Sequence, residues 1–148
     1  MRELILLGTA PSRSLCPFDC ETWGVCGVYT IEKINVIEKK PFRLDKLFIT
    51  DTTFSPEGNL HWDINELHRI KKKYGTEIIT LNPIGFGRMK LKSTQYPYDD
   101  FVEEFQTEYF TDSVTYMIAY ALHLNVYDKF RFYGIDMASK IEYLTQKG

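Results

Sequence analysis

The segment from Glu3 to Arg13 constrains the fold of this chain more than any other part of the sequence. It reads Glu-Leu-Ile-Leu-Leu-Gly-Thr-Ala-Pro-Ser-Arg, an apolar run that ends abruptly at Gly8 and is followed by a loop of small residues. A short, continuous apolar run bounded by turn residues is typical of a strand buried on both faces in a parallel sheet. The segment therefore predicts an α/β protein whose first strand is Leu4–Leu7.

The loop after this strand carries groups that can bind phosphate. A tight turn at a strand end exposes backbone N–H groups, Ser12 adds a hydroxyl donor, and the Arg13 guanidinium can bind an anion at two points. The loop lacks both the Gly-x-Gly-x-x-Gly pattern and the Lys-Ser/Thr of a P-loop, so it indicates no standard cofactor. Two interpretations stay open: a ligand site that includes Gly8, Thr9, Ala10, Ser12 and Arg13, or an ordinary turn with a surface arginine.

Strand-like and helix-like segments alternate along the rest of the chain. Further strands are predicted at Trp23–Tyr29, Lys46–Thr50, Glu77–Leu81 and Lys129–Tyr133, helices at Asp63–Tyr74, Asp99–Phe105 and Ser113–Leu124, and a long loop at Ile84–Tyr98. Such alternation favours right-handed crossovers and parallel strands. We therefore expect one domain over residues 1–148 with a three-layer, Rossmann-like α/β fold, in which helices cover both faces of a mostly parallel sheet of about five strands.

The net charge, the lengths of the apolar stretches and the cysteine spacing indicate which classes of binding partner to expect. The net charge of −2 gives no general attraction to nucleic acid or to anionic membranes, and no apolar stretch approaches the ~20 residues of a membrane span. The first residues lack the features of a secretory signal, so we expect a cytoplasmic protein with neither a nucleic-acid nor a membrane partner. The spacing of Cys16, Cys20 and Cys26 matches no metal site, and we expect free thiols, no metal and no cofactor.

Polar residues at the ends of the predicted strands extend the candidate site. Ligands of parallel α/β sheets bind outside the carboxyl ends of the strands, where the strand order reverses. Besides the first loop, this rule brings together Asp51, Asn82, Gly134 and Asp136. We add to this set Thr111 and Ser113, which lie at the start of the helix that leads into the last strand.

Several members of this set also have a plain structural interpretation. The hydroxyls of Thr111 and Ser113 at a helix start suit an anion or a ribose, but helix caps have the same composition. Asp136 can accept hydrogen bonds from a ribose or base edge, or it can cap a terminal helix, and Asp51 contacts a ligand or organises its own loop. No catalytic triad or pair of carboxylates stands out, which leaves Asp51 and Asp136 as the candidates for a catalytic base.

The two ends of the chain resemble a known group of proteins. Gly8-Thr-Ala-Pro-Ser12 resembles the Gly-x-Gly-Pro-Ser loop of the family 42 bacterial sialyltransferases, and Asp112–Met117 and Tyr133–Asp136 are similar to a helix start and a turn of that family. A closer likeness is to small bacteriophage proteins of unknown function with Gly-Thr-Gly-Pro-Ser-Arg, Tyr-Phe-Thr-Asn-Ser and Tyr-Gly-Ile-Asp-Met motifs. The likeness leaves residues 30–95 nearly uncovered.

This resemblance implies a function. In the sialyltransferases the matching residues hold the cytidine nucleotide of the donor sugar, which would carry over to Gly8, Thr9, Ser12 and Ser113 here. Ala10 departs from the pattern, since it replaces the second glycine, and the chain stops before a counterpart of the transferases' catalytic His and acceptor-binding portion. We therefore expect a protein that binds a nucleotide or a nucleotide-derived phosphate ligand, and that sequesters a host signalling nucleotide in the host cytoplasm on behalf of a phage.

Two alternatives of other classes stay open. One is an enzyme, a reduced glycosyltransferase or a nucleotide-processing enzyme, that uses Asp51 or Asp136 as base. The other is a non-catalytic structural or assembly protein that kept the fold and lost the ligand, because a fold does not decide function. An exposed final sheet edge would also allow pairing with a second copy, so a homo-oligomer is a further expectation.

Overall fold

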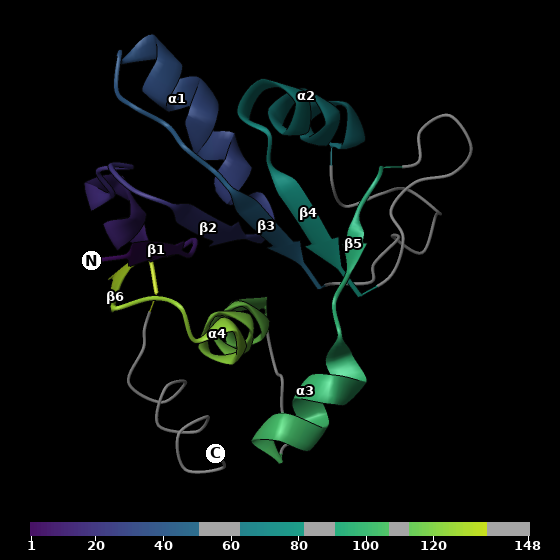
Figure 1. The fold of residues 1–148 in the computed structure, drawn as a ribbon. Coiled ribbons are helices and arrows are strands. Elements are labelled where there is room, and N and C mark those ends of the chain that lie inside the picture. The colour runs from purple at the N-terminus through teal and green to yellow at the C-terminus, as the bar shows by residue number, and fades with distance from the viewer. Residues whose placement is uncertain (51–62, 82–90, 107–112, 136–148) are drawn as a thin grey trace.

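Six parallel strands form the centre of the protein in the computed structural model, which describes residues 1–50, 63–81, 91–106 and 113–135. The strands lie in the order β5-β4-β3-β2-β1-β6, and every neighbouring pair is parallel (Figure 1). They are β1 (Glu3–Leu7), β2 (Thr22–Val25), β3 (Lys46–Ile49), β4 (Glu77–Thr80), β5 (Thr94–Gln95) and β6 (Lys129–Tyr133). The expected three-layer, Rossmann-like fold is confirmed, with six strands rather than about five.

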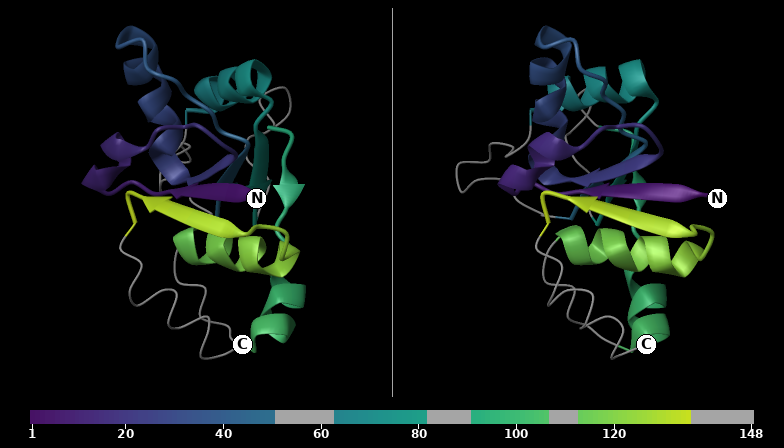
Figure 2. Two further views of the ribbon diagram at one scale, coloured as in Figure 1. Left: turned by 60° about the vertical axis from the view of Figure 1, so that its left-hand side comes forward. Right: turned by 90° about the vertical axis from the view of Figure 1, so that its left-hand side faces the viewer.

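Helices cover both faces of this sheet. α1 (Ile31–Ile37) and α2 (Ile64–Tyr74) lie on one face, while α4 (Ser113–Leu124), with α3 (Tyr98–Phe105) beside it, lies on the other (Figures 1 and 2). Two short 3-10 helices, η1 (Pro11–Leu15) and η2 (Cys26–Thr30), follow β1 and β2. The strand order runs outward from β1 to β5 and then returns to place β6 on the free side of β1. The strand order therefore reverses between β1 and β6, and we call this place the switch point.

The predicted bounds of helices and strands were accurate where residues next to the boundary in the sequence determine where the element begins or ends. The side chain of Asp63 accepts a hydrogen bond from the Glu66 N–H at 3.2 Å, and Gly75 ends α2 with φ of 67°. A side-chain cap and a left-handed glycine are the standard signals for the two ends of a helix. These signals explain why α2 has the predicted bounds.

Two predictions for strands and loops were wrong in part. The strand expected at Trp23–Tyr29 ends at Val25, and η2 folds Val28 back onto the strand so closely that a Cβ on Gly24 would lie 2.4 Å from Val28 Cγ2. The long loop expected at Ile84–Tyr98, for which a short ribbon was the alternative, contains the two-residue strand β5, which pairs with β4. Its residues 84–90 lie outside the described part of the chain.

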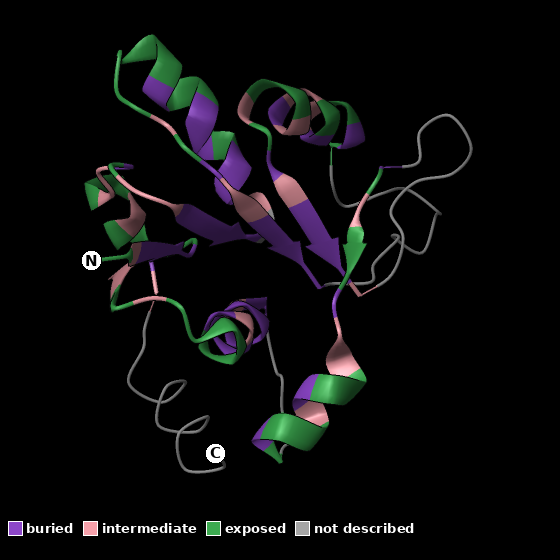
Figure 3. Cartoon of the chain, viewed as in Figure 1, coloured by how far each residue is buried: buried purple, intermediate pink, exposed green. Residues whose placement is uncertain are grey.

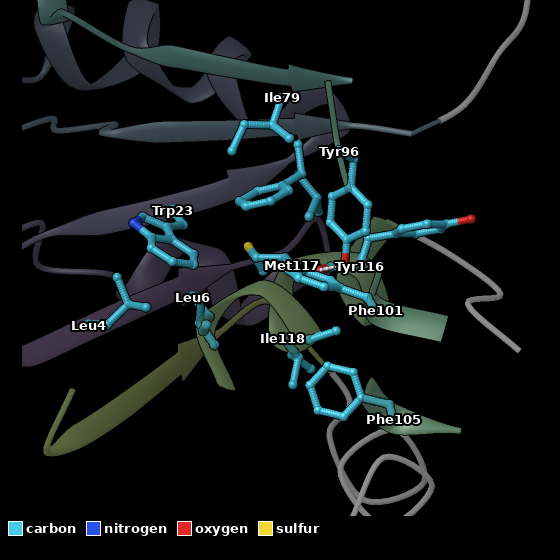
Figure 4. Packing of buried hydrophobic residues seen from close by; sticks show 14 residues of the cluster. Leu4, Leu6, Trp23, Ile79, Tyr96, Phe101, Phe105, Tyr116, Met117 and Ile118 are labelled. Carbon is cyan, nitrogen blue, oxygen red and sulfur yellow. Dashed lines mark hydrogen bonds between the residues drawn. The ribbon is translucent and has the colours of Figure 1, made fainter. Parts of the chain in front are cut away.

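Apolar side chains from both faces of the sheet form two core clusters, as the alternation of side chains along a strand requires. Leu4 and Leu6 of β1 belong to the cluster on the α4 face, and Leu7 belongs to the cluster on the α1–α2 face. The α4 cluster is rich in aromatic rings, among them Trp23, Tyr96 and others drawn in Figure 4. The central strands are buried along most of their length (Figure 3). Among the described residues, no helix has the length and apolar character needed to span a bilayer.

The sequence did not predict α1, because this helix buries polar side chains and exposes apolar ones. Its buried residues are Ile31, Glu32 and Asn35, whereas Ile34, Val36 and Ile37 are 55%, 52% and 80% exposed. An amphipathic helix normally does the reverse. The orientation of α1 therefore needs a specific polar interaction to hold it.

Glu32 supplies that interaction. Its carboxylate is 1% exposed and accepts hydrogen bonds from Arg69 at 2.8 Å, from Lys73 at 3.0 Å and from the Tyr74 hydroxyl at 2.6 Å, all of them on α2. A buried charge is tolerated only when it is paired and hydrogen-bonded. The hydrogen bond from Arg69 is the main reason that the pKa of Glu32 falls from 4.5 to about 2. Glu32 therefore anchors α1 to α2.

The pKa of Glu32 predicts how the stability depends on pH. Because the carboxyl has a lower pKa in the folded chain, its contribution is complete above pH 4.5 and is lost as the pH falls towards 2. The full shift corresponds to at most about 3 kcal/mol of the free energy of unfolding. We expect Glu32→Gln to be less stable than the wild type at neutral pH and to lose less stability on acidification, as measured by urea unfolding across this range. Glu38→Gln, at an exposed position on the same side of the sheet, is the control, and equal acid sensitivity of Glu32→Gln and the wild type would contradict the assignment.

Candidate functional site

The first loop and the turn after the last strand meet at the switch point. Gly8 N–H donates to the Tyr133 carbonyl at 2.8 Å, and Ala10 N–H donates to the Gly134 carbonyl at 2.9 Å. These bonds continue the parallel pairing of β1 and β6 beyond the strands themselves. The carboxyl ends of the two strands, which lie side by side in Figure 2, are therefore joined through their backbones.

Gly8 and Gly134 make this junction possible. A Cβ on Gly8 would lie 2.4 Å from the Gly134 carbonyl oxygen, and a Cβ on Gly134 would lie 2.4 Å from the Gly8 carbonyl oxygen. Gly134 also has φ of 71°, a conformation that favours glycine. Both glycines are thus required by the close approach of two backbones within the chain.

Ser12 completes the junction from the first loop. The Gly134 N–H donates to Ser12 Oγ at 2.8 Å, which leaves the hydroxyl proton of this exposed side chain available to a ligand. Fewer backbone N–H groups of the first loop are free to bind a phosphate than the sequence indicated, because the amides of Gly8, Ala10 and Arg13 donate to acceptors within the chain. The N–H groups of Thr9 and Ser12 donate to no backbone acceptor within the described residues.

Arg13 is the unpaired cation of this region. Its side chain is half-buried and donates through one guanidinium nitrogen to the Thr9 carbonyl at 3.2 Å. No carboxylate among the described residues pairs with it. The other described arginines are each paired with a carboxylate, namely Arg2 with Glu21, Arg43 with Asp45, Arg69 with Glu32 and Arg131 with Asp19. Arg13 therefore retains guanidinium N–H donors that can bind an anion.

Ser113 lies at a different strand end from Arg13. The hydroxyls of Ser113, at the start of α4, and Thr50, directly after β3, are hydrogen-bonded at 2.7 Å, and both residues are buried. β3 is two strands away from β1 in the sheet, which corresponds to about 10 Å. The structure thus groups Gly8, Ser12 and Arg13 with Gly134 but places Ser113 farther along the same edge, where it joins α4 to β3. No sequence pattern indicated Thr50 as the partner of Ser113.

Four predicted site residues, Asp51, Asn82, Thr111 and Asp136, lie outside the described residues, and their roles stay predictions. No group of His, Cys, Asp and Glu side chains in the described ranges could hold a metal ion. The aromatic residues Trp23 and Tyr96 are buried in the core and are not available to stack on a base.

A groove opens beside Arg13 that the sequence did not indicate. It has a volume of about 590 Å³ and lies between residues 13–18, which include the end of η1, and the segment from α1 to Pro41. Cys16 and Asn35 are among its lining residues. Burial raises the pKa of the Cys16 thiol to about 11, so this thiol is neutral at physiological pH. Because the groove depends on α1, which no sequence pattern predicted, no signal in the sequence could have located it.

No family model matches the chain, and no curated protein or solved structure matches it either. The likeness to sialyltransferases and to phage proteins therefore remains a prediction based on the motifs at the two ends of the chain.

The junction at the switch point predicts a contrast between two glycine substitutions. Gly8→Ala places a methyl group against the Gly134 carbonyl, and we expect it to lower the free energy of unfolding by about 1–3 kcal/mol. Gly27→Ala is the matched control, since a Cβ at that position would meet nothing within 4 Å. Urea unfolding of both variants checks the contrast, and equal stability of the two would show that the junction is not as tight as described.

Proposed function

We propose that the protein binds a nucleotide or a nucleotide-derived phosphate ligand at the carboxyl ends of its strands, with the phosphate held by Arg13 and Ser12. The observation that carries this proposal is that Arg13 lies at the switch point and, alone among the described arginines, lacks a carboxylate partner. Parallel α/β sheets bind their ligands at such a point, and a guanidinium suits the geometry of phosphate.

Three further features support the proposal. The junction of Gly8 and Gly134 holds the first loop in place, which limits the entropy lost when a ligand binds. The exposed hydroxyl of Ser12 can donate to a phosphate oxygen while it accepts from Gly134. The Arg13 guanidinium also donates through one terminal nitrogen to the Thr9 carbonyl, so its remaining donors are partly oriented.

The biological role that we propose rests on the resemblance to phage proteins and not on geometry. A protein that binds a nucleotide and leaves it intact would act as a sponge for a host signalling nucleotide. The structure favours neither the enzymatic alternative, whose candidate bases Asp51 and Asp136 lie outside the described residues, nor the assembly alternative.

Arg13→Ala tests the phosphate site. We expect this substitution to weaken the binding of nucleoside monophosphates by about 1–3 kcal/mol, because charge-assisted hydrogen bonds to phosphate are lost. Isothermal titration calorimetry with a panel of nucleotides measures the effect. Arg43→Ala is the matched control, since Arg43 forms an exposed pair with Asp45.

The outcomes of the titration separate the candidate functions. Weaker binding by Arg13→Ala and unchanged binding by Arg43→Ala support the proposal, whereas equal binding by both variants contradicts the site. Mass spectrometry of the incubated nucleotides shows whether any bond is broken, which would favour an enzyme. No binding of any nucleotide by the wild type would favour an assembly protein.

A further inference from the structure

We propose that the groove between the first loop and α1 receives the base of the nucleotide whose phosphate Arg13 binds. This inference rests on the proposed function and adds to it the place and the chemistry of base recognition. The sequence motifs at the two ends of the chain do not include α1 or the segment that follows it.

The groove has the size and composition of a small-molecule site. Its volume of about 590 Å³ lies within the range of roughly 300–1,000 Å³ that is usual for such sites. Apolar walls are formed by Pro17, Phe18, Ile31, Ile34 and Pro41. A few polar groups among apolar walls are what orients a ligand in such a pocket, and here they include Arg13 and Asn35.

The charges at the groove favour one orientation of a bound ligand. Arg13 lines the groove and also belongs to the switch point, so a ligand bound through its phosphate at Arg13 has the groove beside it. The other basic lining residue, Lys40, is neutralised by Glu38, whose carboxylate lies 2.8 Å from its ammonium group. The anionic end of a ligand is therefore favoured at Arg13, and a neutral part is favoured in the rest of the groove.

Asn35 offers a polar contact to a base. The residue is 8% exposed, and its amide nitrogen donates to the Pro41 carbonyl at 2.8 Å. Within the described residues no donor bonds to its carbonyl oxygen. This oxygen can accept a hydrogen bond from a base amino group or ring N–H.

The apolar wall at Ile34 is exposed without a ligand. Ile34 is 55% exposed on a helix that is held in this orientation by the buried Glu32. A base that lies against Ile34 would remove apolar surface from water and so stabilise the complex. The same helix exposes Ile37, which does not line the groove and therefore serves as a control position.

The experiment compares two probes on three proteins. Adenosine monophosphate and ribose phosphate share the phosphate and the sugar and differ in the base, and calorimetry measures both on the wild type, Ile34→Trp and Ile37→Trp. We expect the wild type to bind adenosine monophosphate at least about tenfold more tightly than ribose phosphate. Ile34→Trp, which fills the groove, should remove this difference and leave the affinity for ribose phosphate unchanged, while Ile37→Trp behaves as the wild type.

Alkylation of the cysteines gives an independent readout on the unmodified chain. Cys16 lines the groove, whereas Cys20 does not and accepts a hydrogen bond from Arg131. Bound adenosine monophosphate should slow the reaction of iodoacetamide with Cys16 and leave that of Cys20 unchanged, as mass spectrometry of the digested protein can show. The reaction is run in mildly alkaline buffer because the neutral Cys16 thiol reacts slowly at lower pH.

The two proposals fail in different ways. Equal binding of both probes by the wild type would show that the groove is not the base site. The same conclusion would follow if Ile34→Trp kept the preference for adenosine monophosphate and the ligand also failed to protect Cys16. In either case the phosphate site would remain supported. If the wild type binds neither adenosine monophosphate nor ribose phosphate, and the nucleotide panel also fails to bind, the proposed function falls and the base site falls with it.

Discussion

The contact between Gly8 and Gly134 is the constraint on which the candidate site depends. Two backbones from opposite ends of the chain approach so closely that neither position has room for a Cβ, and Ser12 bonds across the contact. In many α/β proteins the switch point is an open crevice that admits a ligand. Here the backbone bonds of Gly8 and Ala10 join β1 to β6, so the first loop is directed outward as η1 and presents Ser12 and Arg13 at its surface.

The parts of the fold that were predictable from sequence are those whose signals are local. Apolar runs that stop at a turn residue located β1, β3, β4 and β6, and caps located α2. α1 has no such signal, because Glu32 at its buried face is satisfied by partners that lie 37 to 42 residues away in the sequence. β5 is only two residues long, and its pairing with β4 is likewise a tertiary effect. In both cases the tertiary interaction outweighs the local pattern.

The candidate site likewise combines features that the sequence predicts with features that depend on tertiary contacts. That the first loop lies at a strand end and joins the turn at Gly134 follows from the topology, which the sequence indicated. The sequence could not predict that the amides of this loop already donate hydrogen bonds within the chain. The acceptors for Gly8 and Ala10 lie in β6 and in the turn after it. Ser12 likewise bonds to a residue 122 positions away. The pairing of Ser113 with Thr50 across 63 positions is equally invisible in the sequence. Sequence patterns located the ends of the strands but not which polar groups remain free there.

These facts together determine where binding energy can come from. With the amides of Gly8, Ala10 and Arg13 engaged, the backbone contributes less to phosphate binding than in a glycine-rich loop, and the guanidinium of Arg13 has to contribute more. A single cation at a partly solvent-exposed position binds phosphate weakly and with little selectivity. Affinity and selectivity therefore require a second contact surface next to Arg13, and the groove is a feature of the described residues that can provide one. Its apolar wall exists because Glu32 holds α1 with Ile34 outward. The ion pairs of this buried carboxylate with α2 therefore determine the shape of a surface that we assign to a base.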